Sequence, residues 1–534
     1  MESLNLIKAL QDPKLFDHPV SRFQVIETLL SWILLTGPYA YKIKKPILLD
    51  FVDYSSLEKR KYYCQEELKL NQALAGALYV GVIPIRGSEA HPRLNRDGAA
   101  EGVGEGMGEG EIIEYALKMH EFPQDHLLPR LLLAGRIAEE DLEQMGMMLG
   151  KFHHQAEKLE PITATLSSFG TPDRIKSDCL DNFKDYGEEV LNNAPFSAKN
   201  LKIIKEWTLD KVDALFGFFE KRQSSGFVRA CHGDLKINNL VLFENQILAF
   251  DCIEFNPAFR FIDITNDIAF LTMDLKAKNY LYEACYFLNC YLSWTGDYEG
   301  LKGLRFYELY RAMVRRKVVG LSHGQNYIDE AKSYEELALK LIVPQSPQLI
   351  LTSGVSGSGK TTLSRKMAAK LSAIHIRSDV ERKRLFSSYF ASETTRDKDS
   401  DTSSLYTKEK TQKTFERLYQ LAKQIILDGY SVIVDAAFLS LSSRESFFKL
   451  AQSLQVPFHI LHCEAPYPLL CERIQKRLAE KKDASDATQV VLEEQLKVVD
   501  PFSEIEKEYV ISVSTTRDIS DEDMDNLIRQ NILR

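Results

Sequence analysis

Short apolar runs of strand length alternate with helical stretches in the first 138 residues. Apolar residues at strand spacing occupy residues 31–36, 39–44, 77–85 and 111–119. Helical spacing is predicted around residues 20–30 and 59–75. This part of the chain is therefore predicted to be a small, strand-rich lobe.

From residue 139 to 342 the spacing of apolar residues is mostly helical. A pair of strands is predicted in the middle, within the segment RACHGDLKINNLVLFENQILAFD at 229–251. Pro344 and Pro347 then break the helical pattern before a new apolar strand begins. We therefore predict a domain of residues 1–345, with lobes of about 1–138 and 139–345.

After residue 345, strands and helices alternate. Strands are predicted at 348–353, 373–378, 431–436 and 458–463. Helical stretches follow each of them, starting near 360, reaching 428, starting near 443 and continuing beyond 467. Such alternation is typical of a parallel sheet flanked by helices. Residues 346–534 are thus predicted to be an α/β domain.

Composition favours a globular protein of more than one domain. The chain has 534 residues, of which 44% are hydrophobic and 10% aromatic. The apolar run at 25–36 contains Glu27 and is shorter than the roughly 20 residues of a membrane-spanning helix. No secretory signal pattern opens the sequence, so we expect a cytoplasmic protein without a membrane partner. Eight cysteines without a C-x-x-C pair favour neither a disulfide scaffold nor a zinc ribbon.

The distribution of charge gives no support to a nucleic-acid partner, although it does not exclude one. The net charge is −9, and residues 346–534 carry 27 basic and 27 acidic side chains, which leaves the whole excess on residues 1–345. A protein whose affinity comes from phosphate backbones has a basic excess instead.

The segment GVSGSGKT at 354–361 matches the phosphate-binding pattern G-x-x-x-x-G-K-[ST] in full. It follows a predicted strand and opens a helix, which is the context that the chemistry needs. Backbone N–H groups at the helix start hold phosphates, Lys360 meets the β- and γ-phosphates, and the Thr361 hydroxyl holds Mg²⁺. The cofactors predicted are therefore ATP and Mg²⁺. The residues assigned to nucleotide binding here are Gly354, Ser356, Gly357, Ser358, Gly359, Lys360, Thr361 and Thr362.

Acidic residues end two further strands of this domain. Asp435 follows an apolar strand and is assigned to the metal or its waters. Asp379 allows two interpretations: Ser378 and Glu381 form a capping box beside it, or Asp379 accepts the proton of an acceptor hydroxyl while Arg382 holds a phosphate. The two roles are compatible. This spacing resembles P-loop kinases related to polynucleotide kinases and zeta-type toxins.

Arg473 and Arg477 are spaced i and i+4 and so lie on one face of a predicted helix. In the P-loop kinases that this domain resembles, a helical lid carries arginines that close over the transferred phosphate. These two residues are the candidates for that role. A solvated basic face is the other interpretation.

The segment at 229–251 supplies the residue types of a second phosphoryl-transfer site. His232-Gly-Asp234 is followed by Asn239 and then by Asp251 at the end of a strand. Kinase-type transfer uses one carboxylate near the attacking hydroxyl, and an amide oxygen and a second carboxylate on Mg²⁺. Asp234 is assigned the first role, and Asn239 and Asp251 the metal.

Glycine in place of the arginine of the protein-kinase triplet His-Arg-Asp resembles the aminoglycoside phosphotransferase and choline kinase branch. The resemblance implies that Lys42 pairs the α- and β-phosphates and that Glu67 holds the lysine, although Lys44 and Glu66 are close enough to exchange roles with them. It also implies that Asp267 braces the catalytic loop.

The whole chain resembles bacterial two-domain proteins that join an aminoglycoside phosphotransferase-like domain to a P-loop kinase domain. The implied fold is a bilobal kinase-like domain followed by a P-loop NTPase fold. The glycines between 98 and 110 lack the G-x-G-x-x-G spacing and lie among carboxylates, so they are interpreted as a hairpin connection. No conventional glycine-rich loop is found to cover the phosphates of the first domain. The segment 34–40 contains only Gly37.

The sequence thus predicts an ATP-dependent phosphotransferase with two kinase modules and a small-molecule acceptor. Two alternatives stay open. The first is a nucleotide-sensing regulator whose N-terminal domain binds nucleotide but transfers nothing. The second is a 5′-hydroxyl polynucleotide kinase in the C-terminal domain.

Overall fold

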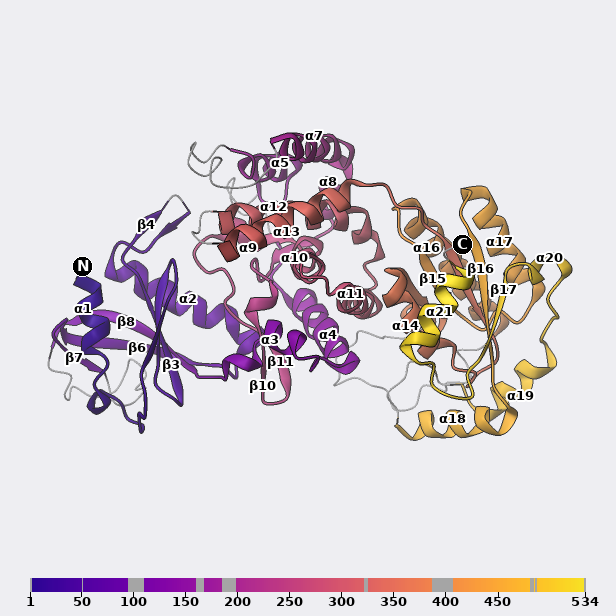
Figure 1. The fold of residues 1–534 in the computed structure, drawn as a ribbon, viewed down its shortest axis with the longest axis horizontal. Coiled ribbons are helices and arrows are strands. Elements are labelled where there is room, and N and C mark those ends of the chain that lie inside the picture. The colour runs from indigo at the N-terminus through magenta and orange to yellow at the C-terminus, as the bar shows by residue number, and fades with distance from the viewer. Residues whose placement is uncertain are drawn as a thin grey trace. The chain divides into compact units, whose positions relative to one another are not determined.

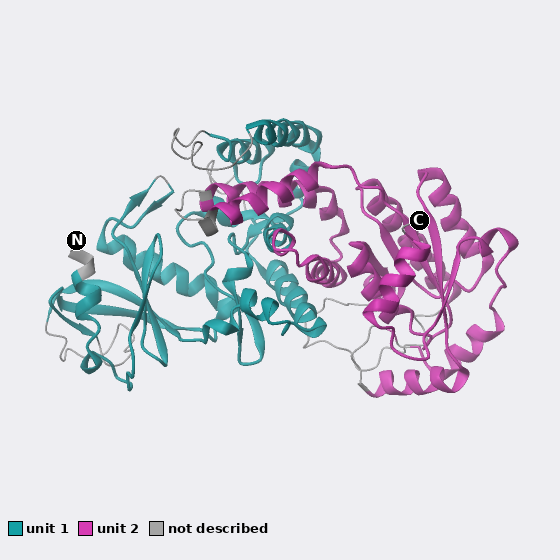
Figure 2. Ribbon diagram, viewed as in Figure 1, with its two compact units in different colours: residues 1–193, 197–274 teal, residues 194–196, 275–534 magenta. Residues whose placement is uncertain are grey.

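The computed structural model describes residues 2–49, 51–94, 110–159, 168–184, 198–320, 325–386, 407–480, 485 and 487–532. The glycines predicted to form a hairpin connection lie outside these residues, except Gly110. The chain divides into two compact units (Figure 2), one of residues 1–193 and 197–274 and one of residues 194–196 and 275–534. The domain boundary near residue 345 stays a prediction.

The small lobe is built on one antiparallel sheet in the order β1-β2-β3-β8-β6-β7. One apolar core lies where β2 and β3 pack with the N-terminal helix, and a second lies beneath α2. The elements are α1 (Glu2–Ala9), β1 (Gln24–Glu27), β2 (Ser31–Leu35), β3 (Tyr39–Lys44), β4 (Leu48–Leu49), β5 (Val52–Asp53), α2 (Leu57–Ala75), β6 (Tyr79–Ser88), β7 (His91–Leu94) and β8 (Ile112–His120), with a 3-10 turn at Pro13–Leu15.

The helix predicted around residues 20–30 is wrong, because this segment forms the edge strand β1. Gln24 to Glu27 pair antiparallel with Leu35 to Trp32 of β2. Val25 and Ile26 fit either spacing over so short a run, and the ladder to β2 decides between them. The predicted helix at 59–75 is confirmed as α2, which begins after the Ser56 cap.

The larger lobe of the first unit is mainly helical, as predicted. Its segment 229–251 contains the hairpin β10 and β11, with Leu240 opposite Ala249. The elements are α3 (Leu128–Leu133), α4 (Glu139–Gln155), α5 (Pro172–Asp181), α7 (Ala198–Ala214), α8 (Phe216–Ser224), β9 (Val228–Ala230), β10 (Leu240–Phe243), β11 (Gln246–Ala249), α9 (Pro257–Arg260), β12 (Phe261–Asp263) and α10 (Ile264–Ala277), with 3-10 turns at Gln124–His126 and Ile237–Asn239.

The second unit contains a five-stranded parallel sheet in the order β14-β15-β13-β16-β17 (Figure 1). Helices α14 and α21 contribute to the core on one face of it, and α16 contacts α17 and the strands β14 and β15. Its elements are α11 (Leu281–Thr295), α12 (Leu301–Gly320), α13 (Gln325–Ile342), β13 (Leu349–Ser353), α14 (Lys360–Leu371), β14 (Ile374–Arg377), α15 (Ser378–Phe386), α16 (Lys408–Leu427), β15 (Val432–Asp435), α17 (Leu441–Leu454), β16 (Phe458–Glu464), α18 (Tyr467–Glu480), α19 (Gln489–Lys497), α20 (Glu504–Lys507), β17 (Val510–Ser514) and α21 (Asp521–Asn531), with a 3-10 turn at Tyr298–Gly300.

These arrangements confirm the predicted fold class. A sheet lobe followed by a helical lobe is the bilobal kinase-like arrangement, and a central first strand flanked by parallel neighbours is the P-loop arrangement. Within the described residues, every helix is too short or too polar to cross a bilayer.

Asp428 is the C-cap residue of α16, and its backbone N–H donates to the carbonyl oxygens of Gln424 and Ile426. Its carboxyl group therefore lies at the end of the helix where the dipole disfavours negative charge. Burial raises the pKa of Asp428 from 3.8 to about 6. The folded state therefore binds this proton more tightly than the unfolded chain does. The free energy of unfolding is expected to fall as pH rises from about 4 to about 6.

Asp428→Asn removes this titration, so the variant is expected to melt at a higher temperature than the unmodified protein at pH 8 and to lose the difference near pH 4. Thermal melts from pH 4 to 8 measure the effect. The exposed Asp210→Asn on α7 is the matched control. Equal pH profiles for Asp428→Asn and the unmodified protein would contradict the assignment.

Candidate functional site

The predicted phosphate loop lies between the end of β13 and the start of α14. Gly354 and Gly357 have φ values of 140° and 81°, which favour glycine. A Cβ on Gly354 would lie 2.6 Å from the Cys463 carbonyl oxygen, and one on Gly357 would lie 2.8 Å from the Leu470 carbonyl oxygen. The loop is therefore packed closely against β16 and α18, and no larger residue fits at either position.

Two phosphate-binding groups of this loop have protein partners. The Lys360 Nζ donates to the Val355 carbonyl oxygen at 2.7 Å, and burial lowers the pKa of Lys360. The Ser356 N–H donates to Oε1 of Gln495 on α19, also at 2.7 Å. A phosphate that takes up the Ser356 N–H must therefore displace the Gln495 side chain.

Asp435, the predicted metal ligand, is the last residue of β15 and is 4% exposed. Its Oδ2 lies 3.3 Å from Nε2 of His375 and 3.8 Å from Nε of Arg377. Burial alone would raise the pKa of Asp435, but His375, Arg377 and the Thr361 hydroxyl hold it well below its usual range. An ionised carboxylate beside a hydroxyl is a donor set that fits Mg²⁺.

Asp379 and Arg382 line the same cavity as the phosphate loop, and its volume is about 1270 Å³. Asp379 is the second residue of α15, directly after β14. The described contacts of Glu381 differ from those of a capping box, because this fully buried carboxylate pairs with Arg384 and Arg417. Glu381 is thus engaged by two arginines, and Asp379 forms part of the cavity wall.

The two lid candidates on α18 have different surroundings. Arg473 donates to the Gly357 carbonyl oxygen at 3.3 Å and to the Thr515 carbonyl oxygen at 2.5 Å, so it holds the phosphate loop against the chain after β17. Arg477 donates to the Ala487 carbonyl oxygen at 2.8 Å, while its buried Nε has no partner among the described residues. Both line the cavity, and Arg477 has the freer guanidinium group.

In the first unit, Glu67 of α2 binds both candidate lysines of β3. Its Oε1 accepts from Lys42 at 2.7 Å and its Oε2 accepts from Lys44 at 2.6 Å. Lys42 also pairs with Asp251, and Lys44 pairs with the buried Glu254. Burial alone would lower the pKa of Lys42, but the two carboxylates raise it well above its usual range. Of the two lysines, Lys42 is the one that contacts Asp251, the carboxylate predicted to hold metal.

The catalytic loop brings Asp234 and Asn239 together. The Asn239 Nδ2 donates to Oδ2 of Asp234 at 2.9 Å, and Lys236 pairs with the same carboxylate. Asp251 has a φ of 66°, and its backbone N–H donates to the Tyr79 hydroxyl at 3.2 Å. Burial would raise the pKa of Asp251, yet Lys42 holds it well below its usual range. An ionised carboxylate and an amide oxygen are again suitable donors for Mg²⁺.

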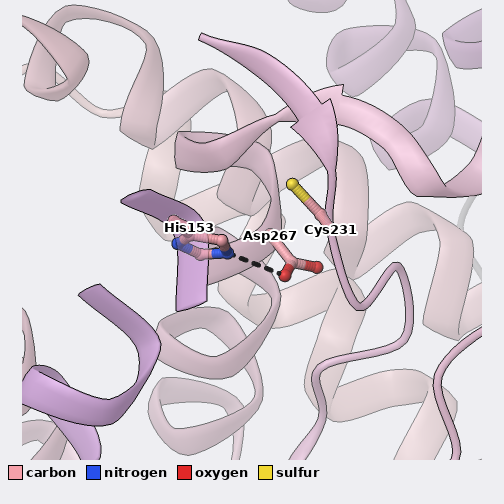
Figure 3. A group of neighbouring side chains, drawn as sticks. All are labelled: His153, Cys231 and Asp267. Atoms are coloured by element: carbon pink, nitrogen blue, oxygen red, sulfur yellow. Dashed lines mark hydrogen bonds and ion pairs between the residues drawn. The ribbon is translucent and has the colours of Figure 1, made fainter. Parts of the chain in front are cut away.

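Asp267 braces this loop from α10, as the resemblance implies. Its carboxylate accepts from the backbone N–H groups of His232 at 3.1 Å and Gly233 at 2.9 Å. His153 of α4 lies 3.1 Å from the same carboxylate, and Cys231 lies beside them (Figure 3). Because backbone donors already occupy both oxygens of the buried Asp267, this group fits a hydrogen-bonded support better than a metal site.

Sequence reasoning missed several residues that these sites use. Lys236 could have been recognised from the sequence, because it lies within the segment 229–251, two residues after Asp234. The others contact the sites from elements distant in the chain and lack a local motif. They are His153, Glu254, His375 and Gln495.

Comparison with known proteins agrees with a chain of two parts. A family model described as an AAA domain matches residues 349–502. An uncharacterized protein of Mycobacterium tuberculosis (strain H37Rv) is 27% identical over 474 residues, which cover 88% of this chain and 89% of that protein. An uncharacterized protein of Mycobacterium bovis has the same identity and coverage. The similarity to both proteins therefore spans the two parts.

Two solved structures are similar to different parts of the chain. A choline kinase from Cryptosporidium parvum has a TM-score of 0.38 and 13% identity, covering 64% of this chain and 94% of its own. A gluconokinase from Sinorhizobium meliloti has a TM-score of 0.26 and 20% identity, covering 35% of this chain and 95% of its own.

The topology of the two units agrees with a bilobal kinase-like fold in the first and a P-loop fold in the second, where the AAA model matches. The predicted resemblance is confirmed in these terms.

The contact between Gln495 and the Ser356 N–H predicts competition with nucleotide. Gln495→Ala removes a hydrogen bond with a net contribution of about 0.5–1.5 kcal/mol, so ATP affinity is expected to rise about two- to tenfold. Calorimetric titration of ATP into the full chain measures it. Val490→Ala, exposed on the same helix, is the control and should leave affinity unchanged. Weaker ATP binding by Gln495→Ala would show that Gln495 supports phosphate binding instead.

Proposed function

We propose that this protein is a Mg²⁺-dependent phosphotransferase with two kinase modules, which moves the terminal phosphate of ATP to hydroxyl groups of small-molecule acceptors. The observation that carries the proposal is the content of one cavity in the second unit. The phosphate loop, Asp435, Asp379 and Arg382 all line it, so donor, metal and acceptor groups have places within reach of one another.

In the P-loop module, Lys360 and the loop N–H groups bind the phosphates of the nucleotide, and Thr361 and Asp435 hold Mg²⁺, which neutralises phosphate charge when bound. Asp379 orients the acceptor hydroxyl and takes its proton. A bond then forms between that oxygen and the terminal phosphorus as the bond to the leaving nucleoside diphosphate breaks. Arg382 and Arg477 stabilise the charge of the phosphoryl group in transit.

In the kinase-like module, Asp234 takes the orienting role and Lys236 beside it faces the transferred phosphate. Asn239 and Asp251 hold Mg²⁺, while Lys42, held by Glu67, binds the nucleotide phosphates. Lys42 forms an ion pair with Asp251. This ion pair must therefore break when the nucleotide binds Lys42 and the metal binds Asp251.

Paired substitutions in the full chain separate the two modules. Lys360→Ala is expected to lower the turnover of the P-loop module about 100-fold or more, because the terminal phosphate loses its cation. Asp234→Asn is expected to abolish transfer by the kinase-like module while nucleotide binding continues. ADP release over a panel of sugars, aminoglycosides and peptides measures both, with the double variant as the blank.

Lys45→Ala, which removes the ion pair with Glu27 next to β3, is the control and should retain full turnover. The proposal for the P-loop module is overturned if Lys360→Ala leaves both ATP affinity and ADP release unchanged.

One observation favours a second candidate, a nucleotide-sensing first domain. Lys42 and Asp251 neutralise each other directly, and Lys236 does the same for Asp234. For a sensor, Asp234→Asn would alter neither ADP release nor nucleotide affinity, whereas Lys42→Ala would weaken binding. Labelling of 5′-hydroxyl oligonucleotides, lost on Asp379→Asn, would instead identify the acceptor of the P-loop module as a polynucleotide.

A further inference from the structure

Helix α11 packs against the phosphate-binding half of the second unit. It contacts α14, the helix that follows the phosphate loop, and the edge strand β14. Most of its residues from Ala284 to Leu292 are buried. Within the described residues β14 pairs with β15 alone, and its other edge is covered by α11, a helix that precedes the predicted domain boundary near residue 345.

Asn289 makes the polar contact between this helix and the strand. Its Oδ1 accepts from the His375 backbone N–H at 2.8 Å, and its Nδ2 donates to the Ala373 carbonyl oxygen at 3.0 Å. One side-chain amide thus satisfies a donor and an acceptor of the strand, as a neighbouring strand would. Asn289 is 6% exposed, so water cannot readily replace it.

His375, whose backbone is held by Asn289, contacts the site through its side chain. The His375 ring nitrogen Nε2 lies 3.0 Å from the Ser364 hydroxyl of α14 and 3.3 Å from Oδ2 of Asp435. A buried ring with two partners places the Asp435 carboxylate relative to the phosphate-loop helix. Asn289 sets the backbone from which that ring projects.

A second contact ties the end of α11 to the acceptor side of the cavity. Arg384 of α15 donates to the Ser293 carbonyl oxygen at 2.7 Å and pairs with the buried Glu381 at 3.1 Å. Helix α15 also carries Asp379 and Arg382. Strand β14, which carries His375, and helix α15 are therefore both attached to α11.

We propose that Asn289 is a positioning residue of the P-loop site, which acts through His375 to hold Asp435 in place for Mg²⁺. The proposal rests on the proposed function of that site. It makes α11, which the sequence assigns to the kinase-like domain, part of the structure on which the second site depends.

The test measures ATP affinity of the full chain by calorimetry, with and without Mg²⁺. Asn289→Leu keeps the size of the side chain and removes both hydrogen bonds. It is expected to reduce the Mg²⁺-dependent gain in ATP affinity about 10- to 100-fold, the range for residues that orient metal ligands, with little change in metal-free ATP binding. Leu281→Ala, exposed in the first turn of the same helix, is the matched control.

A double-mutant cycle tests whether the effect passes through His375. His375→Gln alone is expected to give a loss of similar size, and the double variant is expected to be no worse than the more affected single variant. If Asn289→Leu unfolds below the assay temperature, His375→Gln alone tests the contact to Asp435 by the same titration. Losses that multiply in the double variant, or normal Mg²⁺-dependent binding in either single variant, would overturn the proposal.

The two proposals fail in different ways. If the unmodified protein shows no Mg²⁺-dependent ATP binding that Lys360→Ala removes, the proposed function of the P-loop site is wrong. If it shows such binding and Asn289→Leu matches it, the site stands and the role of Asn289 is wrong.

Discussion

Parallel pairing of β14, β15 and β13 determines where the chemical groups of the second site meet. Arg377 lies opposite Asp435 across β14 and β15, and Leu351 lies opposite Val434 across β13 and β15. Because parallel strands present their carboxyl ends at one edge, the segment 354–361, the Asp435 carboxylate and the start of α15 follow at the same side of the sheet. A register shift of one residue would turn Asp435 to the opposite face.

The site in the first unit depends on a different interaction, in which one buried glutamate binds two lysines. Glu67 is fully buried and accepts from both Lys42 and Lys44. Each lysine has a further acidic partner, and burial raises the pKa of one of these, Glu254. Removing one member of such a network leaves an uncompensated buried charge, so its geometry is defined more strictly than that of an exposed pair.

Features that lie within a few consecutive residues could be predicted from the sequence, whereas features that depend on pairing between distant segments could not. The phosphate loop and the segment 229–251 were recognisable because each holds its chemistry within a few consecutive residues. The edge strand β1 was not, because four residues containing Val25 and Ile26 satisfy helical and extended spacing alike until β2 pairs with them. The hairpin strand β7 was missed for a similar reason, since His91 to Leu94 gains its strand character from β6.

The sequence by itself determined the order of the two folds, the phosphate loop from Gly354 to Thr361 and the residue types of the kinase-like loop. Glycine and hydroxyl residues at fixed spacing limit the local backbone, and this information lies within the segment itself. Only the tertiary structure decided that Glu67 binds both lysines, that Arg473 holds the phosphate loop, and that Asn289 reaches β14. These contacts join residues far apart in the chain, and the energy that selects each partner comes from burial and hydrogen bonding that exist only after folding.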